Sequence, residues 1–228
     1  MAKPHYENPD RNVPIFEEIF RRNGLDWVLI GGLAAIRRRS DKRETVDVDF
    51  VVSGLEDLEA QLLETGTRWL KIAREPNGTP YLIQGETNDG MHFDIYVHDW
   101  DPKDEFEFER AVLETKDDYH VASAEAIIVY KLMAMRPQDI DDIQSILRAH
   151  PNFDGLDLEF IEKWAREYDL YDLWAEFVNE ARRNSPTKLA YPLPPRSRGP
   201  KQGKQREGLI RKTGVDKNGH PYTRWVRP

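Results

Sequence analysis

Apolar and polar residues alternate along the first half of the chain with two different periods. A period of two indicates a strand with one buried face, and a period near 3.6 indicates a helix with one buried face. Pro-Asn-Gly at 76–78 and Asn-Asp-Gly at 88–90 favour tight turns between neighbouring strands. The pattern predicts helices over residues 12–22, 33–39 and 53–64 and strands over residues 27–30, 45–52, 69–73, 81–84 and 91–97.

From Ser123 onward the apolar spacing is helical, and it predicts helices over residues 123–135, 138–148, 157–168 and 170–183. Residues 185–205 contain five prolines and several basic residues, which is typical of a linker. Beyond the linker, the runs 208–213 and 221–226 flank an Asp-Lys-Asn-Gly turn and predict a hairpin. A hairpin of two strands is marginal alone, so we expect it to pack on another element.

Composition restricts the class of protein. With 228 residues and 39% hydrophobic content, the chain can bury one good core and add a small accessory domain. The absence of cysteine excludes disulfides and thiolate zinc sites. No apolar run is long enough to cross a bilayer, and the polar N-terminus lacks a signal-peptide core, so we expect a cytoplasmic protein with no membrane partner.

Charge is distributed unevenly along the chain. Residues 181–228 contain thirteen Lys/Arg and two Asp/Glu, a net charge of +11, which leaves −19 on residues 1–180. A basic tail can bind RNA, DNA or an acidic protein, and it can equally fold back on its own acidic body.

Two glycines and two aspartates are the first candidates for chemistry. Gly31-Gly32 separates an apolar run from a helical one, where backbone N–H groups at a helix N-terminus can contact phosphate. Asp47 and Asp49 fall on one face of a strand, about 7 Å apart. The repulsion between two such carboxylates is relieved by a proton, a basic partner or a cation. Because the ligand atoms are oxygens, the expected cation is Mg²⁺ or Mn²⁺. A positive-φ turn and a solvated strand face are the alternatives, and the apolar neighbours of the aspartates disfavour the second.

A third carboxylate is expected near this pair. Asp94 lies in the alternating run 91–97, on the same face as His92, which we interpret as structural. Three aspartates holding two metal ions would bind a nucleoside triphosphate, activate an attacking hydroxyl and stabilise the pyrophosphate leaving group. The chemistry that these residues predict is nucleotidyl transfer.

A second polar group lies in the helical half. Lys131 occupies an apolar run, where a lysine either extends its ammonium to water or binds triphosphate charge. Arg136-Pro137 ends that helix, since proline cannot continue the hydrogen-bond ladder. Asp139 and Asp142 then fall one turn apart on the next helix and could hold either cation in place.

In this order, the residues resemble the nucleotidyltransferase superfamily, specifically its minimal-nucleotidyltransferase and AbiEii-like toxin members. The family pattern is a Gly-Gly or Gly-Ser pair, a helix, Arg-x-Thr-x-Asp-x-Asp, a later strand aspartate, and Lys-x-x-Ala followed by Arg and Lys-Asp-x-x-Asp. The matching residues are Gly31, Gly32, Arg43, Thr45, Asp47, Asp49, Asp94, Lys131, Arg136, Asp139 and Asp142. Gln138 stands where the family's lysine is common, and the resemblance spans about residues 13–150.

The resemblance implies an Mg²⁺- or Mn²⁺-dependent enzyme. Its catalytic residues would be Asp47, Asp49, Asp94 and Lys131, with the three aspartates as metal ligands, and its nucleotide-binding residues Gly31, Gly32, Arg43, Thr45 and Arg136. We interpret Arg43 and Thr45 as positioning residues first and ligands second. The expected fold is α/β, with a nucleotidyltransferase-like mixed sheet flanked by helices in the catalytic core, residues 1–120. A helical C-terminal subdomain is expected in 121–184, followed by a basic linker and β-hairpin tail in 185–228.

Three functions remain open at this point. The first is transfer of a nucleotide to RNA, and to tRNA in particular, by the toxin of a toxin-antitoxin system with an antitoxin protein as partner. The second is transfer to a small molecule such as an aminoglycoside, because an acidic body attracts a polycation. The third is a non-catalytic binding module that keeps the fold. Modification of a protein side chain is a further nucleotidyl-transfer reaction that fits these residues.

Overall fold

A computed structural model of the chain describes residues 11–54, 58–74, 78, 80–97, 107–184, 210–215 and 221–226. These residues divide into two compact units. The first lies within residues 1–37 and 42–123, and the second within residues 38–41 and 124–228. Each unit is therefore described separately.

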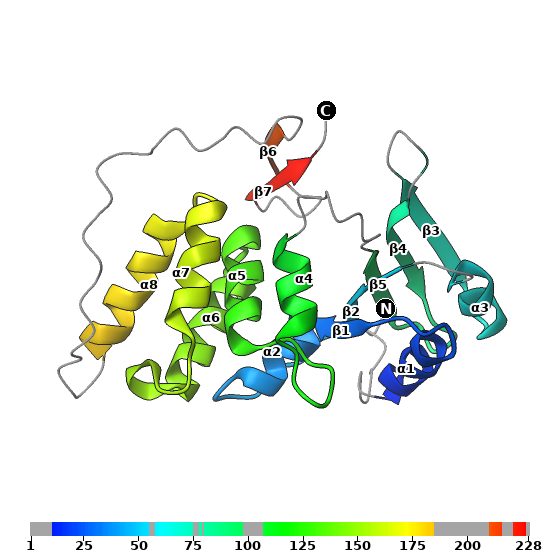
Figure 1. The fold of residues 1–228 in the computed structure, drawn as a ribbon, viewed down its shortest axis with the longest axis horizontal. Coiled ribbons are helices and arrows are strands. Elements are labelled where there is room, and N and C mark those ends of the chain that lie inside the picture. Colours follow the sequence, from blue (N-terminus) through cyan, green and yellow to red (C-terminus); the bar gives the residue numbers. More distant parts are fainter. Residues whose placement is uncertain are drawn as a thin grey trace, which may run out of the picture. The chain divides into compact units, whose positions relative to one another are not determined.

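The first unit is built on a five-stranded mixed sheet (Figure 1). Its strands, in spatial order, are β1 (Trp27–Ile30), β2 (Asp47–Val52), β5 (His92–Val97), β4 (Pro80–Glu86) and β3 (Trp69–Arg74). Only the central pair β2–β5 is parallel, and the other three pairs are antiparallel. The predicted α/β fold with a mixed sheet and flanking helices is confirmed.

One face of this sheet forms the apolar core of the unit. Helix α1 (Val13–Arg22) places Phe16 against Phe50 of β2 and Phe93 of β5, with ring centroids 5.2 and 4.9 Å apart. Helix α3 (Leu58–Glu64) contributes buried leucines to the same unit. Because side chains alternate along a strand, burial of Phe50 and Phe93 directs Asp49 and Asp94 to the opposite face.

Several boundaries differ from the sequence prediction. Strand β2 begins at Asp47 and not at Thr45, and helix α2 (Gly31–Arg38) begins at the glycine pair itself. Helix α4 (Glu107–Glu114) was not predicted, because its apolar signal is short. The helix predicted over residues 53–64 is observed as α3 from Leu58, and residues 55–57 lie outside the described residues.

The second unit is helical, as predicted. Its helices are α5 (Ala124–Ala134), α6 (Pro137–Ala149), α7 (Leu158–Glu167) and α8 (Tyr171–Asn184). The aromatic stripe of the last two helices is core, since Trp164 and Trp174 are buried. The predicted hairpin is confirmed as the antiparallel pair β6 (Ile210–Val215) and β7 (Pro221–Val226), with β7 beside α5. The predicted linker, 185–205, and the hairpin turn lie outside the described residues.

Candidate functional site

The glycine pair lies where β1 ends and α2 begins. Gly31 has a φ of +67°, and a Cβ there would lie 1.8 Å from Oδ2 of Asp49. A Cβ on Gly32 would lie 2.7 Å from Nη2 of Arg43 and 2.7 Å from Oγ1 of Thr45. Neither position can carry a side chain without displacing these groups. The fold thus brings together the glycine pair and three residues that follow it in sequence, and Arg43 and Thr45 lie where positioning residues are expected.

The N-terminus of α2 is suited to an anion. The first turn of the helix contains no acidic residue. Backbone N–H groups in the first turn have no partner within their own helix, and the helix dipole adds partial positive charge at this end. A phosphate group placed there would meet N–H donors of the first turn at Gly31, which is partly exposed, whereas Gly32 is buried.

The candidate carboxylates lie beside this turn, on the sheet face opposite α1. Asp49 of β2 and Asp94 of β5 are register partners in the parallel pair, and Asp47 is the partner of His92. Asp47 is exposed, whereas Asp49 and Asp94 are half-buried. The backbone therefore places the two half-buried carboxylates on adjacent strands.

The electrostatic environment of Asp94 disfavours its charge. Burial raises the pKa of the Asp94 carboxyl above its ordinary value, and the negative charge of Asp47 adds to that increase. A hydrogen bond that Nε2 of Gln84 donates to Oδ1 of Asp94 over 3.0 Å acts in the opposite direction and lowers the pKa. Asp94 accordingly takes up a proton more readily than an ordinary surface aspartate does.

The side chains of the three aspartates do not converge on one point. Asp49 is turned toward Gly31, and Asp94 is held by Gln84. Within the part of the chain that the structure describes, no group of three or more His, Asp or Glu side chains is placed to hold a metal ion. The strand positions would allow the three aspartates to share a metal ion, whereas their side chains do not point toward a common site. Metal binding by Asp47, Asp49 and Asp94 therefore stays a prediction.

The same sheet face continues across β4 to β3. Asp47, His92, Glu86 and Trp69 follow one another in register over four strands. Glu86 accepts hydrogen bonds from Trp69 Nε1 over 3.0 Å and from Arg68 Nη1 over 2.7 Å. We did not identify this row from the sequence, although its members occupy the non-core positions of their strands.

Lys131 lies in the helical unit and is only 4% exposed. Its Nζ is 2.8 Å from Asp139 Oδ1 and 2.9 Å from Asp142 Oδ2. The interpretation that this lysine extends to water is therefore wrong, since the helices bury it against two carboxylates. The expectation that the two aspartates of α6 hold a cation is confirmed, and a catalytic role for Lys131 stays a prediction.

Arg136 precedes α6 and shares one of these carboxylates. Its backbone N–H and its Nε donate to Oδ2 of Asp139, over 3.0 and 2.7 Å. Burial is the largest influence on the pKa of Asp139 and raises it, but the hydrogen bond from Arg136 and the charge of Lys131 together lower it. Asp139 is thus a charged residue that both caps α6 and stabilises a buried ammonium.

Sequence analysis did not identify Arg39, whose side chain is 2% exposed. It pairs with the buried Asp142, with Asp141 over 2.7 Å and with Asp41 over 3.0 Å. A hydrogen bond from Ser145, supported by Arg39, lowers the pKa of Asp41 to about 2. In the sequence Arg39 ends a run of three arginines, which is typical of a solvated face, so no local signal marked it.

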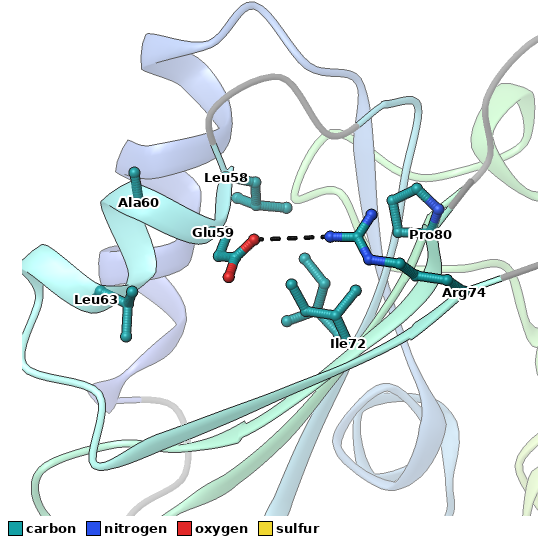
Figure 2. Close-up of a pocket in the computed structure, with 8 residues that line it drawn as sticks. Leu58, Glu59, Ala60, Leu63, Ile72, Arg74 and Pro80 are labelled. Carbon is teal, nitrogen blue, oxygen red and sulfur yellow. Dashed lines mark ion pairs between the residues drawn. The ribbon is translucent and has the colours of Figure 1, made fainter. Parts of the chain in front are cut away.

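A separate cavity lies on the other face of the sheet (Figure 2). It measures about 490 Å³ and lies between α3 and the β3–β4 pair, with Leu58, Ile72 and Ile83 in its lining. Glu59 and Arg74 form an ion pair of 3.8 Å beside it (Figure 2). Ile83 is the register partner of Ile95 on the core face, so the cavity is distinct from the carboxylate site.

No protein-family model and no curated protein matches this chain. Within the part of the chain that the structure describes, no helix is long and apolar enough to span a membrane.

Three solved structures illustrate the similarity of fold. An antigenic nucleotidyltransferase-like protein from Paracoccidioides brasiliensis is 16% identical, with a TM-score of 0.47 over 79% of this chain and 94% of that one. The antibiotic-resistance factor ANT(2'')-Ia is 15% identical, with a TM-score of 0.47 over 78% and 100%. The lincosamide antibiotic adenylyltransferase LnuA is 14% identical, with a TM-score of 0.45 over 60% and 95%. The structural neighbours are nucleotidyltransferase-like proteins, and at these values the similarity establishes neither a family nor a substrate for this chain.

Proposed function

We propose that this protein transfers a nucleoside monophosphate from a nucleoside triphosphate to an acceptor hydroxyl. The observation that carries the proposal is the packing of Asp49 against Gly31, at a helix N-terminus beside Asp94. This arrangement combines an anion-binding turn with acidic groups, which is the pairing that phosphoryl-transfer chemistry requires.

Each residue of the first unit has a distinct role in this proposal. The backbone N–H groups of Gly31 and Gly32 bind the triphosphate, and Arg43 and Thr45 support the turn. Asp47, Asp49 and Asp94 would hold Mg²⁺ or Mn²⁺ once their side chains turn toward a common point, and the ion would neutralise phosphate charge and make the acceptor hydroxyl more acidic. For Lys131 and Arg136, which lie in the other unit, phosphate binding stays a prediction from the sequence.

Asp94, the register partner of Asp49, would accept the proton of the acceptor hydroxyl. The hydroxyl oxygen then forms a bond to the α-phosphorus, while the bond from that phosphorus to the bridging oxygen of the β-phosphate breaks. Pyrophosphate leaves with the electron pair of that bond. No redox partner is needed, because the step exchanges one phosphorus–oxygen bond for another.

We propose RNA, and tRNA in particular, as the acceptor, because residues 181–228 carry a net charge of +11. A toxin of a toxin-antitoxin pair, acting in the cytoplasm, would use this reaction and would have an antitoxin protein as partner. The charge of −19 on residues 1–180 favours a second candidate, transfer to a polycationic small molecule such as an aminoglycoside.

The test is transfer by the purified full-length chain of label from each α-labelled nucleoside triphosphate with Mg²⁺ or Mn²⁺. Total RNA, protein extract and aminoglycosides are offered in separate reactions. We expect label in RNA from one nucleotide, and none with Asp47→Asn. Label in aminoglycosides alone would select the second candidate. Label in none of the acceptors would contradict the transferase proposal and favour a binding module. Growth arrest on expression, relieved by Asp49→Asn, would support the toxin role.

A further inference from the structure

We propose that the row formed by Trp69, Glu86 and His92, called here the Trp69 strip, stacks on the terminal nucleotide of a single-stranded RNA acceptor. This inference rests on the proposed function and names the part of the site that holds the acceptor. The strip lies on the sheet face that carries the candidate carboxylates, within the same unit.

The strip lies next to the candidate carboxylates. Trp69, Glu86 and His92 are consecutive register partners, and His92 is the partner of Asp47. Neighbouring strands are about 4.8 Å apart, so the row extends from Asp47 to Trp69 over roughly 15 Å. A chain whose terminal hydroxyl reaches the carboxylates would therefore lie with its last bases over the strip.

The indole of Trp69 is exposed and is held in one orientation. Trp69 is 40% exposed, although large aromatic side chains are usually well buried. Its N–H is bound to Glu86 over 3.0 Å, and its ring meets that of His92 edge to face, with centroids 6.0 Å apart at 68°. A ring already held in one orientation loses little entropy when a base stacks on it.

The charged side chains at and beside the strip favour RNA. Glu86 accepts hydrogen bonds from Arg68 as well as from Trp69, so its negative charge is matched within the strip. Lys71, the register partner of Gln84 one row further on, is exposed on β3. Aromatic rings next to cations are the combination that binds single-stranded nucleic acid. The one carboxylate within the strip, Glu86, is paired with Arg68, so the strip itself favours RNA over a polycationic acceptor.

The experiment measures binding of fluorescein-labelled single-stranded RNA 12-mers by anisotropy, with the full-length protein in EDTA. We expect Trp69→Ala to weaken binding about 5- to 150-fold, the range for one lost base stack, and Trp69→Phe to retain most of it. Tyr81→Ala is the matched control, because Tyr81 is equally exposed but lies on the opposite face, and it should bind as the wild type does. In the transfer assay, Trp69→Ala should raise KM for RNA and leave KM for the triphosphate unchanged.

Equal RNA binding by Trp69→Ala and wild type would overturn the inference, even if nucleotidyl transfer itself were found. Loss of RNA binding in a chain that shows no transfer would support the strip and refute the transferase proposal. Far-ultraviolet circular dichroism checks that the variant folds. Should it not fold, crosslinking of a 3′-terminal 4-thiouridine to wild-type protein decides the matter. A crosslinked peptide containing Trp69 or His92 supports the inference, and crosslinks confined to other peptides overturn it.

Discussion

The two units each contain a cluster of acidic residues, and the clusters differ in how completely their charge is matched. In the sheet unit, burial raises the pKa of Asp94 and repulsion from Asp47 adds to that increase, and the carboxyl has an amide, Gln84, as its hydrogen-bond donor. In the helical unit, Asp139 and Asp142 are fully buried against Lys131, and Arg39 pairs with Asp142. Carboxylates whose negative charge is unmatched are stabilised when a cation or a proton binds. Carboxylates already matched by buried cations stabilise the fold instead.

The largest expected effect is on activity. Asp47→Asn should lower nucleotidyl transfer at least about a thousandfold, as loss of a group that acts in the reaction does. Because Asp47 is exposed, the free energy of unfolding should change by no more than about 0.5 kcal/mol. Labelled-nucleotide transfer and urea unfolding measure the two quantities. Asp118→Asn, an equal charge change at another exposed position of the same unit, is the control, and full activity in Asp47→Asn would remove this residue from the site.

In the helical unit the expected effect is a loss of stability. Asp142→Asn should cost about 3–5 kcal/mol, because it leaves buried cations without a matched carboxylate. Asp141→Asn is a close control, since Asp141 also pairs with Arg39 but is 55% exposed and should cost less than about 1 kcal/mol. Urea unfolding at neutral pH measures both. Equal losses in the two variants would show that burial does not distinguish these ion pairs.

A smaller loss of stability is expected at the glycine turn. Gly31→Ala should cost about 1–3 kcal/mol, because the residue has positive φ and its Cβ would overlap Asp49. Gly24 has a similar φ of +63° with nothing within 4 Å, so Gly24→Ala isolates the backbone cost alone. The excess loss in Gly31→Ala then measures the steric conflict with Asp49. Indistinguishable losses would mean that Asp49 moves away from the turn freely.

The smallest effects are the changes of stability with pH, and they should have opposite signs in the two clusters. The pKa of Asp94 is raised by folding, so this carboxyl favours the folded state at acidic pH and loses that contribution as pH rises through its folded pKa. The pKa of Asp139 is lowered, so its contribution is present at neutral pH and is lost as pH falls through its folded pKa.

Urea unfolding of Asp94→Asn and Asp139→Asn across pH tests this contrast. The first variant should be more stable than the wild type at neutral pH, and the second less stable, with both differences shrinking in acid. Carbon-detected NMR titration should also show a lower pKa for Asp94 in Asp47→Asn. An unchanged Asp94 pKa in that variant would exclude repulsion between the two carboxylates.

The parts of the molecule that the sequence predicts correctly depend on local periodicity. The run Trp27–Ile30 is the observed β1, and alternation around Asp49 places the aspartates on one face, because strand geometry imposes these relations on neighbouring residues. The same alternation does not determine where a carboxylate points. Asp49 faces Gly31 and Asp94 faces Gln84 because of neighbours on other strands.

The missed residues depend on contacts between distant parts of the chain. Arg39 pairs with Asp142, 103 residues away, and nothing in the run of arginines distinguishes it from a solvated side chain. Trp69 lies in the same row as Asp47 only because four strands pair in this register. Helix α4 is a different case, since it spans only Glu107–Glu114 and its apolar pattern rests on the three buried residues Phe108, Val112 and Leu113.

The parallel pairing of β2 with β5 also determines when the site can exist. Asp49 and Asp94 are adjacent in space but 45 residues apart in sequence, and the chain between them contains α3, β3 and β4. Pairs of such wide separation close late in folding, since chain entropy opposes them until local structure has formed. On the ribosome, β2 emerges well before its partner strand. A nascent or truncated chain that ends before β5 therefore lacks the acidic pair on which the proposed transfer depends.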